Sequence, residues 1–234
     1  MRTLLGLILL IPVQDRPGGP FGDAYGKLPK VPKGVNVEKD LVYASPDETD
    51  VKLDLYRTPS DRARPAIVFI HGGGWRSRDK GDFPWYCAML AKEGYVVASI
   101  NYRYSSVAKY PAQIEDGQNA VRWLRKNAKK YGILPDRIGA IGGSAGGHLA
   151  GLLGSKNEEG AGVQAVVSCF GECDLQDAPG GRRLIGGTPE TKHDLWKDAC
   201  SSTHVSKDDP PSSLCTAIRT RRSPSLFPRL IGGI

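Results

Sequence analysis

Four short apolar runs in the middle of the chain carry its strongest structural signal. Each run is continuous rather than alternating, which is typical of strands that other elements cover on both faces. Helical patterns over residues 83–94, 111–132 and 144–154 separate them, and each pattern ends at a glycine. Strands that alternate with helices predict an α/β fold, a mostly parallel sheet with helices on both faces. The runs are AIVFIHGG (66–73), YVVASINY (95–102), RIGAIGG (137–143) and VQAVVSCFG (163–171).

The segments before and after these runs differ in character. VNVEKDLVYA (35–44) and VKLDLYRTP (51–59) alternate polar and apolar residues and predict an antiparallel pair at one edge of the sheet. A polar, partly helical stretch near residues 180–205 predicts a short cap. We therefore divide the chain into an apolar start with a Pro- and Gly-rich linker (1–34), one partial α/β domain (35–211) and a tail that fits no element (212–234).

The first residues resemble a targeting segment. The apolar run from Leu4 to Val13 is too short to span a bilayer but fits the central region of a secretory signal peptide. Bulky Ile11 and Val13 stand where a cleavage site prefers small residues. We expect export to the periplasm or secretion, with a cytoplasmic location as the alternative, and no integral membrane span.

Charge and cysteine usage argue against two other classes. The formal net charge is +7, but Arg219, Arg221, Arg222 and Arg229 supply four of it, so residues 1–211 carry only 7 − 4 = +3. We therefore expect no nucleic-acid partner. The five cysteines lack the spacing of zinc ligands, and buried free thiols are the simplest interpretation. We expect no metal; the cysteines are Cys87, Cys169, Cys173, Cys200 and Cys215.

The motif most specific for chemistry is the G-x-S-x-G sequence from Gly142 to Gly146. It lies between a predicted strand and a predicted helix, where a nucleophilic serine stands on a sharp turn at the end of the strand. Glycines on either side let the strand and helix approach without Cβ clashes. The position therefore predicts that Ser144 is a nucleophile, with a plain Gly-rich turn as the alternative.

A second motif, His71-Gly72-Gly73-Gly74-Trp75, directly follows the strand over 66–70. Consecutive glycines can turn backbone N–H groups into a cavity, where they stabilise the oxyanion of an acyl-transfer intermediate. A phosphate-binding loop would need Lys followed by Ser or Thr, which Trp75-Arg76 does not supply. The two motifs together favour acyl transfer.

These motifs and their surroundings resemble the α/β-hydrolase esterases related to hormone-sensitive lipase, in particular the bacterial branch of feruloyl and acetyl esterases. The resemblance spans Val35 to Pro211. It is carried by HGGGW (71–75), INYRYS (100–105), YPAQIEDGQNAVRWLRKNA (110–128), DRIGAIGGSAGGHLA (136–150), GGTPE (186–190) and THVSKDDPP (203–211).

The resemblance implies a serine esterase that uses no metal or organic cofactor. Ser144 would be the nucleophile, and the backbone N–H groups of Gly73, Gly74 and Ala145 would form the oxyanion hole. Trp75 would line the acyl pocket or serve as a buried aromatic, and Asp116 would be structural. The substrates would be short-acyl or aromatic esters, including acetyl or feruloyl esters of polysaccharide.

The acid and base that such a serine needs are missing from their expected places. In the family they follow the serine, acid first and histidine last, on loops after the last two strands. The four histidines here are His71, His148, His193 and His204, and none stands after the cap. We therefore expect a domain that lacks its C-terminal strands and helix, and a nearly inactive chain.

The tail can be read in another frame. Synonymous codons for the residues from Cys215 onward, read from the third base, translate as HGDPDKTVPVSLPK, which contains the family's H-G-D-x-D-x-x-V-P loop. We therefore interpret the tail from about Ser212 as out of frame, with genuine divergence as the alternative. Two other functions stay open: a peptidase of the prolyl-oligopeptidase type, and a hydrolase-fold binding protein without catalysis.

Overall fold

The computed structural model describes residues 30–175, 178, 180–207 and 209–215. Seven strands form one sheet in the order β1-β2-β4-β3-β5-β6-β7. β2 runs antiparallel to both β1 and β4, and the remaining neighbours are parallel. The strands are β1 (Asn36–Ala44), β2 (Val51–Arg57), β3 (Arg64–Ile70), β4 (Val96–Ile100), β5 (Ile133–Gly143), β6 (Ala165–Cys169) and β7 (Ser212–Cys215).

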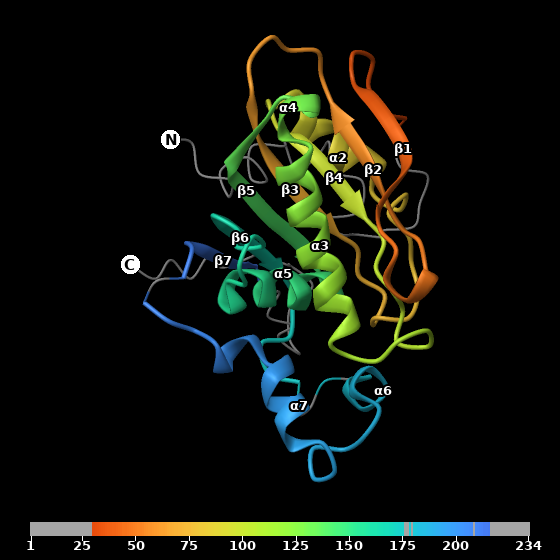
Figure 1. Cartoon of the computed structure of the whole chain (residues 1–234), viewed down its shortest axis with the longest axis vertical. Coiled ribbons are helices and arrows are strands. Elements are labelled where there is room, and N and C mark those ends of the chain that lie inside the picture. The colour runs from red at the N-terminus through yellow and green to blue at the C-terminus, as the bar shows by residue number, and fades with distance from the viewer. Residues whose placement is uncertain (1–29, 176–177, 179, 208, 216–234) are drawn as a thin grey trace, which may run out of the picture.

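The helices lie between the strands and beside them (Figure 1). α3 and α5 cover one face of the sheet, and α2 covers the other. The α-helices are α2 (Pro84–Lys92), α3 (Ala112–Lys126), α4 (Ala128–Tyr131), α5 (Ala145–Lys156), α6 (Gly181–Ile185) and α7 (His193–Ala199); two 3₁₀ helices are η2 (Pro46–Glu48) and η3 (Ser201–Thr203).

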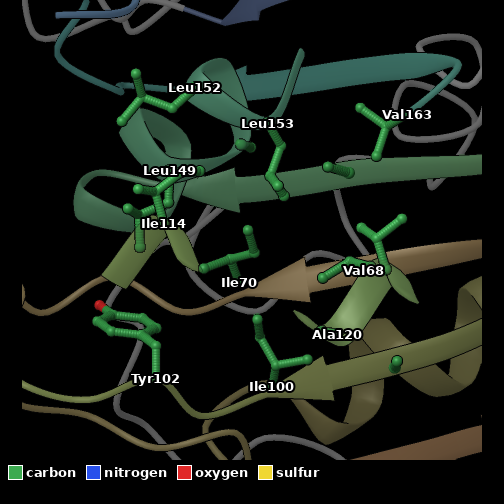
Figure 2. Packing of buried hydrophobic residues seen from close by; sticks show 14 of the residues in the cluster. Val68, Ile70, Ile100, Tyr102, Ile114, Ala120, Leu149, Leu152, Leu153 and Val163 are labelled. Atoms are coloured by element: carbon green, nitrogen blue, oxygen red, sulfur yellow. The ribbon is translucent and has the colours of Figure 1, made fainter. Parts of the chain in front are cut away.

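The continuous apolar runs are explained by burial on both faces. In β3, Ala66, Val68 and Ile70 join the core under α3 and α5, while Ile67 and Phe69 join the core under α2. Successive strand residues point to opposite faces, so both must be apolar when both faces are covered. Figure 2 shows the first of these cores, in which Ile70 and Ile100 lie beside residues of α3 and α5.

The helical pattern over residues 111–132 is divided in two. α3 ends at Lys126 and α4 begins at Ala128, because Asn127 leaves helical geometry at φ −99° and ψ 12°. The side-chain amide of Asn127 donates to the carbonyl oxygen of Trp123 at 2.9 Å. Asparagine offers the backbone this local alternative to the helix, and Gly132 then ends α4 in the left-handed region.

One strand lies beyond the domain boundary that we expect at Pro211. Residues Ser212–Cys215 form β7, which runs parallel to β6 with Val166 opposite Ser212 and Cys169 opposite Cys215. The sheet therefore continues four residues beyond the expected end of the domain. The rest of the tail, from residue 216, and the apolar start lie outside the described residues.

The predicted cap is α6, α7 and η3, which lie below α3 and α5 in Figure 1. The backbone N–H of Tyr110 donates to Leu184 of α6 at 3.0 Å, and the hydroxyl of Tyr110 donates to the Asp198 carboxylate at 2.7 Å. The segment that leads into α3 therefore holds both cap helices. Within the described ranges no helix is long and apolar enough to cross a membrane.

Candidate active site

Ser144 occupies a strained turn between β5 and α5. Its φ of 53° and ψ of −121° lie outside the regions that non-glycine residues favour, and its side chain is exposed. The N–H of Ser144 donates to the carbonyl oxygen of Cys169 at 2.8 Å, which ties the turn to the end of β6. Such strain persists only where the surrounding structure enforces it, and it is the geometry expected of a nucleophile turn.

The glycines on either side of Ser144 are required by space. A Cβ on Gly142 would overlap the carbonyl group of Gly146 and lie 2.9 Å from the nitrogen of Gly147. A Cβ on Gly146 would lie 2.6 Å from the carbonyl oxygen of His71 and closer still to that of Ile70. Strand, turn and helix can meet here only through glycine.

Residues 71–75 form a tight loop after β3, which we call the oxyanion loop after the role that the sequence predicts for it. Gly73, Gly74 and Trp75 have φ values of 102°, 59° and 57°. The carbonyl oxygen of Gly73 accepts from the N–H of Arg76 at 3.2 Å and from the hydroxyl of Ser77 at 3.0 Å. The loop therefore folds back on the residues that follow it.

The structure brings the oxyanion loop against Ser144. A Cβ built on Gly72 would lie 3.5 Å from the Cβ of Ser144 and 2.9 Å from the carbonyl oxygen of Gly143. Within the described residues, the N–H groups of Gly73 and Gly74 donate to no protein acceptor. Ala145 is the first residue of α5, where a helix leaves its N–H groups without internal partners. Unpaired donors therefore stand on both sides of the serine.

Trp75 points inward rather than toward solvent. Its side chain is buried, and the indole N–H donates to Nδ1 of His148 at 3.2 Å, with the two rings edge to face. The geometry therefore favours the buried aromatic over the lining of an acyl pocket, the two alternatives that the sequence leaves open.

Two of the four histidines are buried next to the site. Burial lowers the pKa of His148 to about 4, and its Nε2 bonds to the carbonyl oxygen of Ala199 at 2.7 Å. Burial also lowers the pKa of His71, whose ring stacks on Tyr102 and whose Nδ1 bonds to Gly72. Neither ring bonds to Ser144.

The other two histidines belong to the cap. His193 is exposed at the start of α7, and Nε2 of His204 bonds to the carbonyl oxygen of Asp198 at 2.8 Å. Asp198 also binds Lys156 of α5, which lies twelve residues after Ser144. In the described part of the chain, no histidine is hydrogen-bonded to Ser144.

Asp116 is placed as the sequence suggests, as a structural carboxylate. It is fully buried on α3 and accepts from the backbone N–H of Arg103 at 2.8 Å and from Nε of the same residue at 3.1 Å. Burial raises the pKa of Asp116, and the bonds from Arg103 oppose that rise. The pair ties the loop after β4 to α3.

One support of the oxyanion loop and one buried ion-pair cluster escape the sequence reasoning. The hydroxyl of Tyr102 donates to the carbonyl oxygens of His71 and Gly72 at 3.2 and 3.1 Å. Lys80 is buried beyond the loop and bonds to Asp40 and Asp54 at 2.9 Å each. Tyr102 was signalled only by its place after a buried strand, whereas Lys80 stands in a polar stretch that looks exposed.

The cysteines that the structure describes are all free thiols. No group of three or more His, Cys, Asp or Glu side chains able to hold a metal ion occurs in the described segments. Cys87, Cys169 and Cys200 are buried free thiols, as the sequence suggests, whereas Cys173 is exposed.

Comparisons with known proteins identify the family. The family model BD-FAE matches residues 53–218, well over half of the chain. "Probable carboxylic ester hydrolase LipM" of Mycobacterium tuberculosis is 33% identical over 183 residues, 68% of this chain and 42% of that protein. Esterase LipQ of the same organism is 30% identical over 198 residues, 74% of this chain and 46% of that protein. The chain thus spans less than half the length of these curated relatives.

Solved structures give the same fold. A truncated form of a carbohydrate esterase from gut microbiota superposes with a TM-score of 0.69 at 30% identity, covering 76% of this chain and 75% of that one. The thermophilic esterase Est2 of Thermogutta terrifontis superposes with a TM-score of 0.64 at 28% identity, covering 81% and 73%. The fold is that of the α/β-hydrolases, and the chain belongs to the BD-FAE family of carboxylic ester hydrolases.

Proposed function

We propose that Ser144 is the nucleophile of an ester hydrolase that works through an acyl-enzyme. Oγ of Ser144 attacks the ester carbonyl carbon and passes its proton to water, and the carbonyl oxygen becomes an oxyanion. The N–H groups of Gly73, Gly74 and Ala145 then stabilise that oxyanion. The alcohol leaves with a proton, and water releases the acid from the serine.

One observation carries this proposal. The exposed Ser144 stands on a strained turn beside a loop in which the N–H groups of Gly73 and Gly74 have no acceptor among the described residues. A Gly-rich turn with a purely structural role has no need of strain at a serine. The proximity of Gly72 to Ser144 also joins two motifs that lie more than seventy positions apart in the sequence.

The substrate class is proposed from the relatives. A structural neighbour is a carbohydrate esterase, and Est2 of Thermogutta terrifontis has been solved with propionate bound. We propose short-acyl or aromatic esters, with acetyl or feruloyl esters of polysaccharide as the candidates. Export to the periplasm or secretion stays a prediction, because Leu4–Val13 lies outside the described residues.

We also propose that a polypeptide of this sequence turns over slowly. All four histidines are described: both ring nitrogens of His148 and one each of His71 and His204 bond elsewhere, Nε2 of His71 is buried without a partner, and His193 is exposed on the cap, so none is hydrogen-bonded to Ser144. A serine without its base retains only the catalysis that the oxyanion hole and binding supply, roughly 10³–10⁴-fold over water in serine proteases.

A fluorophosphonate probe and p-nitrophenyl acetate test these points together. We expect slow labelling, located at Ser144 by mass spectrometry, and negligible ester turnover. Ser144→Ala should abolish labelling, whereas Ser155→Ala, on the same helix but bonded to Gly151, should not. Robust turnover that Ser144→Ala abolishes would confirm the nucleophile and contradict slow turnover.

The same experiment separates the two alternatives. Binding of esters without any labelling of Ser144 would favour a hydrolase-fold binding protein. Cleavage of peptide substrates in preference to esters would favour a peptidase of the prolyl-oligopeptidase type.

A further inference from the structure

His148 joins three parts of the site through one side chain. It lies on α5 four residues after Ser144, and its side chain is 1% exposed. One ring nitrogen bonds to Trp75 of the oxyanion loop, and the other bonds to Ala199 at the end of cap helix α7. The nucleophile helix, the oxyanion loop and the cap therefore meet at this imidazole.

The bonding partners assign the tautomer. An indole N–H can only donate, so Nδ1 of His148 must accept and carry no proton. A carbonyl oxygen can only accept, so Nε2 must carry the proton and donate to Ala199. Burial lowers the pKa of His148 to about 4, which keeps the ring neutral at ordinary pH. Only the neutral ring with its proton on Nε2 can form both hydrogen bonds.

Trp75 transmits this constraint to the oxyanion loop. Its backbone follows Gly74 directly and has a φ of 57°, and its carbonyl oxygen accepts from the N–H of Ser105 at 2.7 Å. The bond to His148 fixes the other end of the residue. With backbone and side chain both held, the peptide planes of Gly73 and Gly74 have little freedom to rotate.

The cap side is held in the same way. Ala199 is the last residue of α7, and Trp196 of that helix packs against Gly181 at the start of α6, where an added Cβ would lie 2.7 Å from the indole. Gly180, next to it, lies against the ring of Trp75. Cap and oxyanion loop therefore touch each other and share one anchor on α5.

We propose that His148 is a positioning residue whose single neutral tautomer holds the oxyanion loop and the cap in register with Ser144. This inference rests on the proposed function only in taking residues 71–75 as the oxyanion loop. In this role His148 transfers no proton and does not contact the substrate, so it is not the catalytic base.

Three substitutions at His148 test its two hydrogen bonds individually and together. The amide oxygen of asparagine can take the place of Nδ1 and accept from Trp75, so His148→Asn retains the loop bond alone. The amide nitrogen of glutamine can take the place of Nε2 and donate to Ala199, so His148→Gln retains the cap bond alone. His148→Leu introduces an apolar side chain of similar size that can make neither bond.

We expect the labelling of Ser144 and the hydrogen exchange of the cap to respond differently to the three variants. Labelling of Ser144 by the fluorophosphonate should fall about tenfold or more in His148→Gln and His148→Leu, and much less in His148→Asn, because misplaced oxyanion donors cost rate steeply. Amide hydrogen exchange of α6 and α7 should accelerate in His148→Asn and His148→Leu, and less in His148→Gln. Equal effects of all three variants on both readouts would overturn the proposal.

A spectroscopic test is independent of reactivity. In ¹⁵N-histidine spectra at pH 7, His148 should show an unprotonated Nδ1 and a protonated Nε2, and Trp75→Phe should shift the Nδ1 resonance while Nε2, which still donates to Ala199, keeps its proton. A proton on Nδ1, or a charged ring at pH 6, would overturn the inference. If wild-type Ser144 is never labelled, the proposed function fails, while the spectra and the exchange of the cap still decide the role of His148.

Discussion

At the scale of single residues, contacts rather than propensities decide which glycines are irreplaceable. Gly146 and Gly151 both lie in α5, where alanine is intrinsically favoured by about 1 kcal/mol. A Cβ on Gly146 would collide with backbone carbonyls of residues 70 and 71, whereas a Cβ on Gly151 would lie 3.4 Å from the hydroxyl of Ser201, an ordinary contact. The same substitution should therefore have opposite effects at the two positions.

We expect Gly146→Ala to lower the free energy of unfolding by about 1–3 kcal/mol, the usual cost of overpacking, and to reduce labelling of Ser144. Gly151→Ala should leave stability unchanged or raise it. Urea unfolding followed by circular dichroism measures both. Equal stability of the two variants would show that the turn relaxes around an added methyl group.

At the scale of elements, the cap depends on a small polar cluster at the end of α7. The Asp198 carboxylate binds Lys156 of α5 at 2.5 Å and the hydroxyl of Tyr110 at 2.7 Å. Burial alone would raise the pKa of Asp198, but the bonds from Lys156 and Tyr110 outweigh it and hold the pKa below its usual value. The folded state therefore prefers the ionised carboxylate.

This preference predicts how the cap responds to pH. A carboxyl group with a lowered pKa contributes stability that is fully present above its unfolded pKa of about 3.9 and lost as pH falls through the folded value. Asp198→Asn should cost on the order of 1 kcal/mol at pH 7, since the carboxylate is 39% exposed, and nothing at pH 2. Thermal unfolding across this range measures the difference.

A matched variant lies on the same helix. Asp194 is exposed in the first turn of α7 and makes no hydrogen bond or ion pair with the described residues. Asp194→Asn should therefore change stability by a few tenths of a kcal/mol at most, through the helix dipole. A pH-independent loss in Asp198→Asn would contradict the assigned role of its charge.

At the scale of the whole molecule, the sequence predicts the buried strands and the helices that cover them better than it predicts which side chains meet. Runs such as AIVFI and YVVASI must be buried on both faces, so they predict the parallel strands and the helices that cover them. Nothing local reveals that Lys80 is buried between Asp40 and Asp54, or that His148 meets Trp75, because these partners are brought together only by the sheet order. The break between α3 and α4, by contrast, has a local cause that the sequence shows, since the side chain of Asn127 competes with the helix for backbone hydrogen bonds.

The same limit applies to β7. Its four residues, Ser212–Cys215, are too few and too polar to show strand character in the sequence, and their pairing with β6 supplies the missing information. Strand propensity depends mainly on the neighbours that a segment packs against. The parallel register shows that the sheet extends at least to Cys215, beyond the boundary that the composition suggests.

The residues that follow keep the alternative reading that the sequence allows. The reading that yields HGDPDKTVP starts at the third base of codon 215, the last residue that the structure describes. In the family that the sequence resembles, the acid loop follows the strand after THVSKDDPP, the place that β7 occupies here. We therefore propose that the frame changes between Pro211 and Cys215.

The nucleotide sequence of the gene tests this directly. We expect the frame that begins at the third base of codon 215 to encode H-G-D-x-D followed by V-P, with one base lost or two gained just upstream. Only synonymous codon choice is free, because the first two bases of most codons are fixed by the printed residues. A gene that encodes no such loop in either alternative frame would establish residues 216–229 as genuine divergence, and the acid of Ser144 would then have to come from elsewhere.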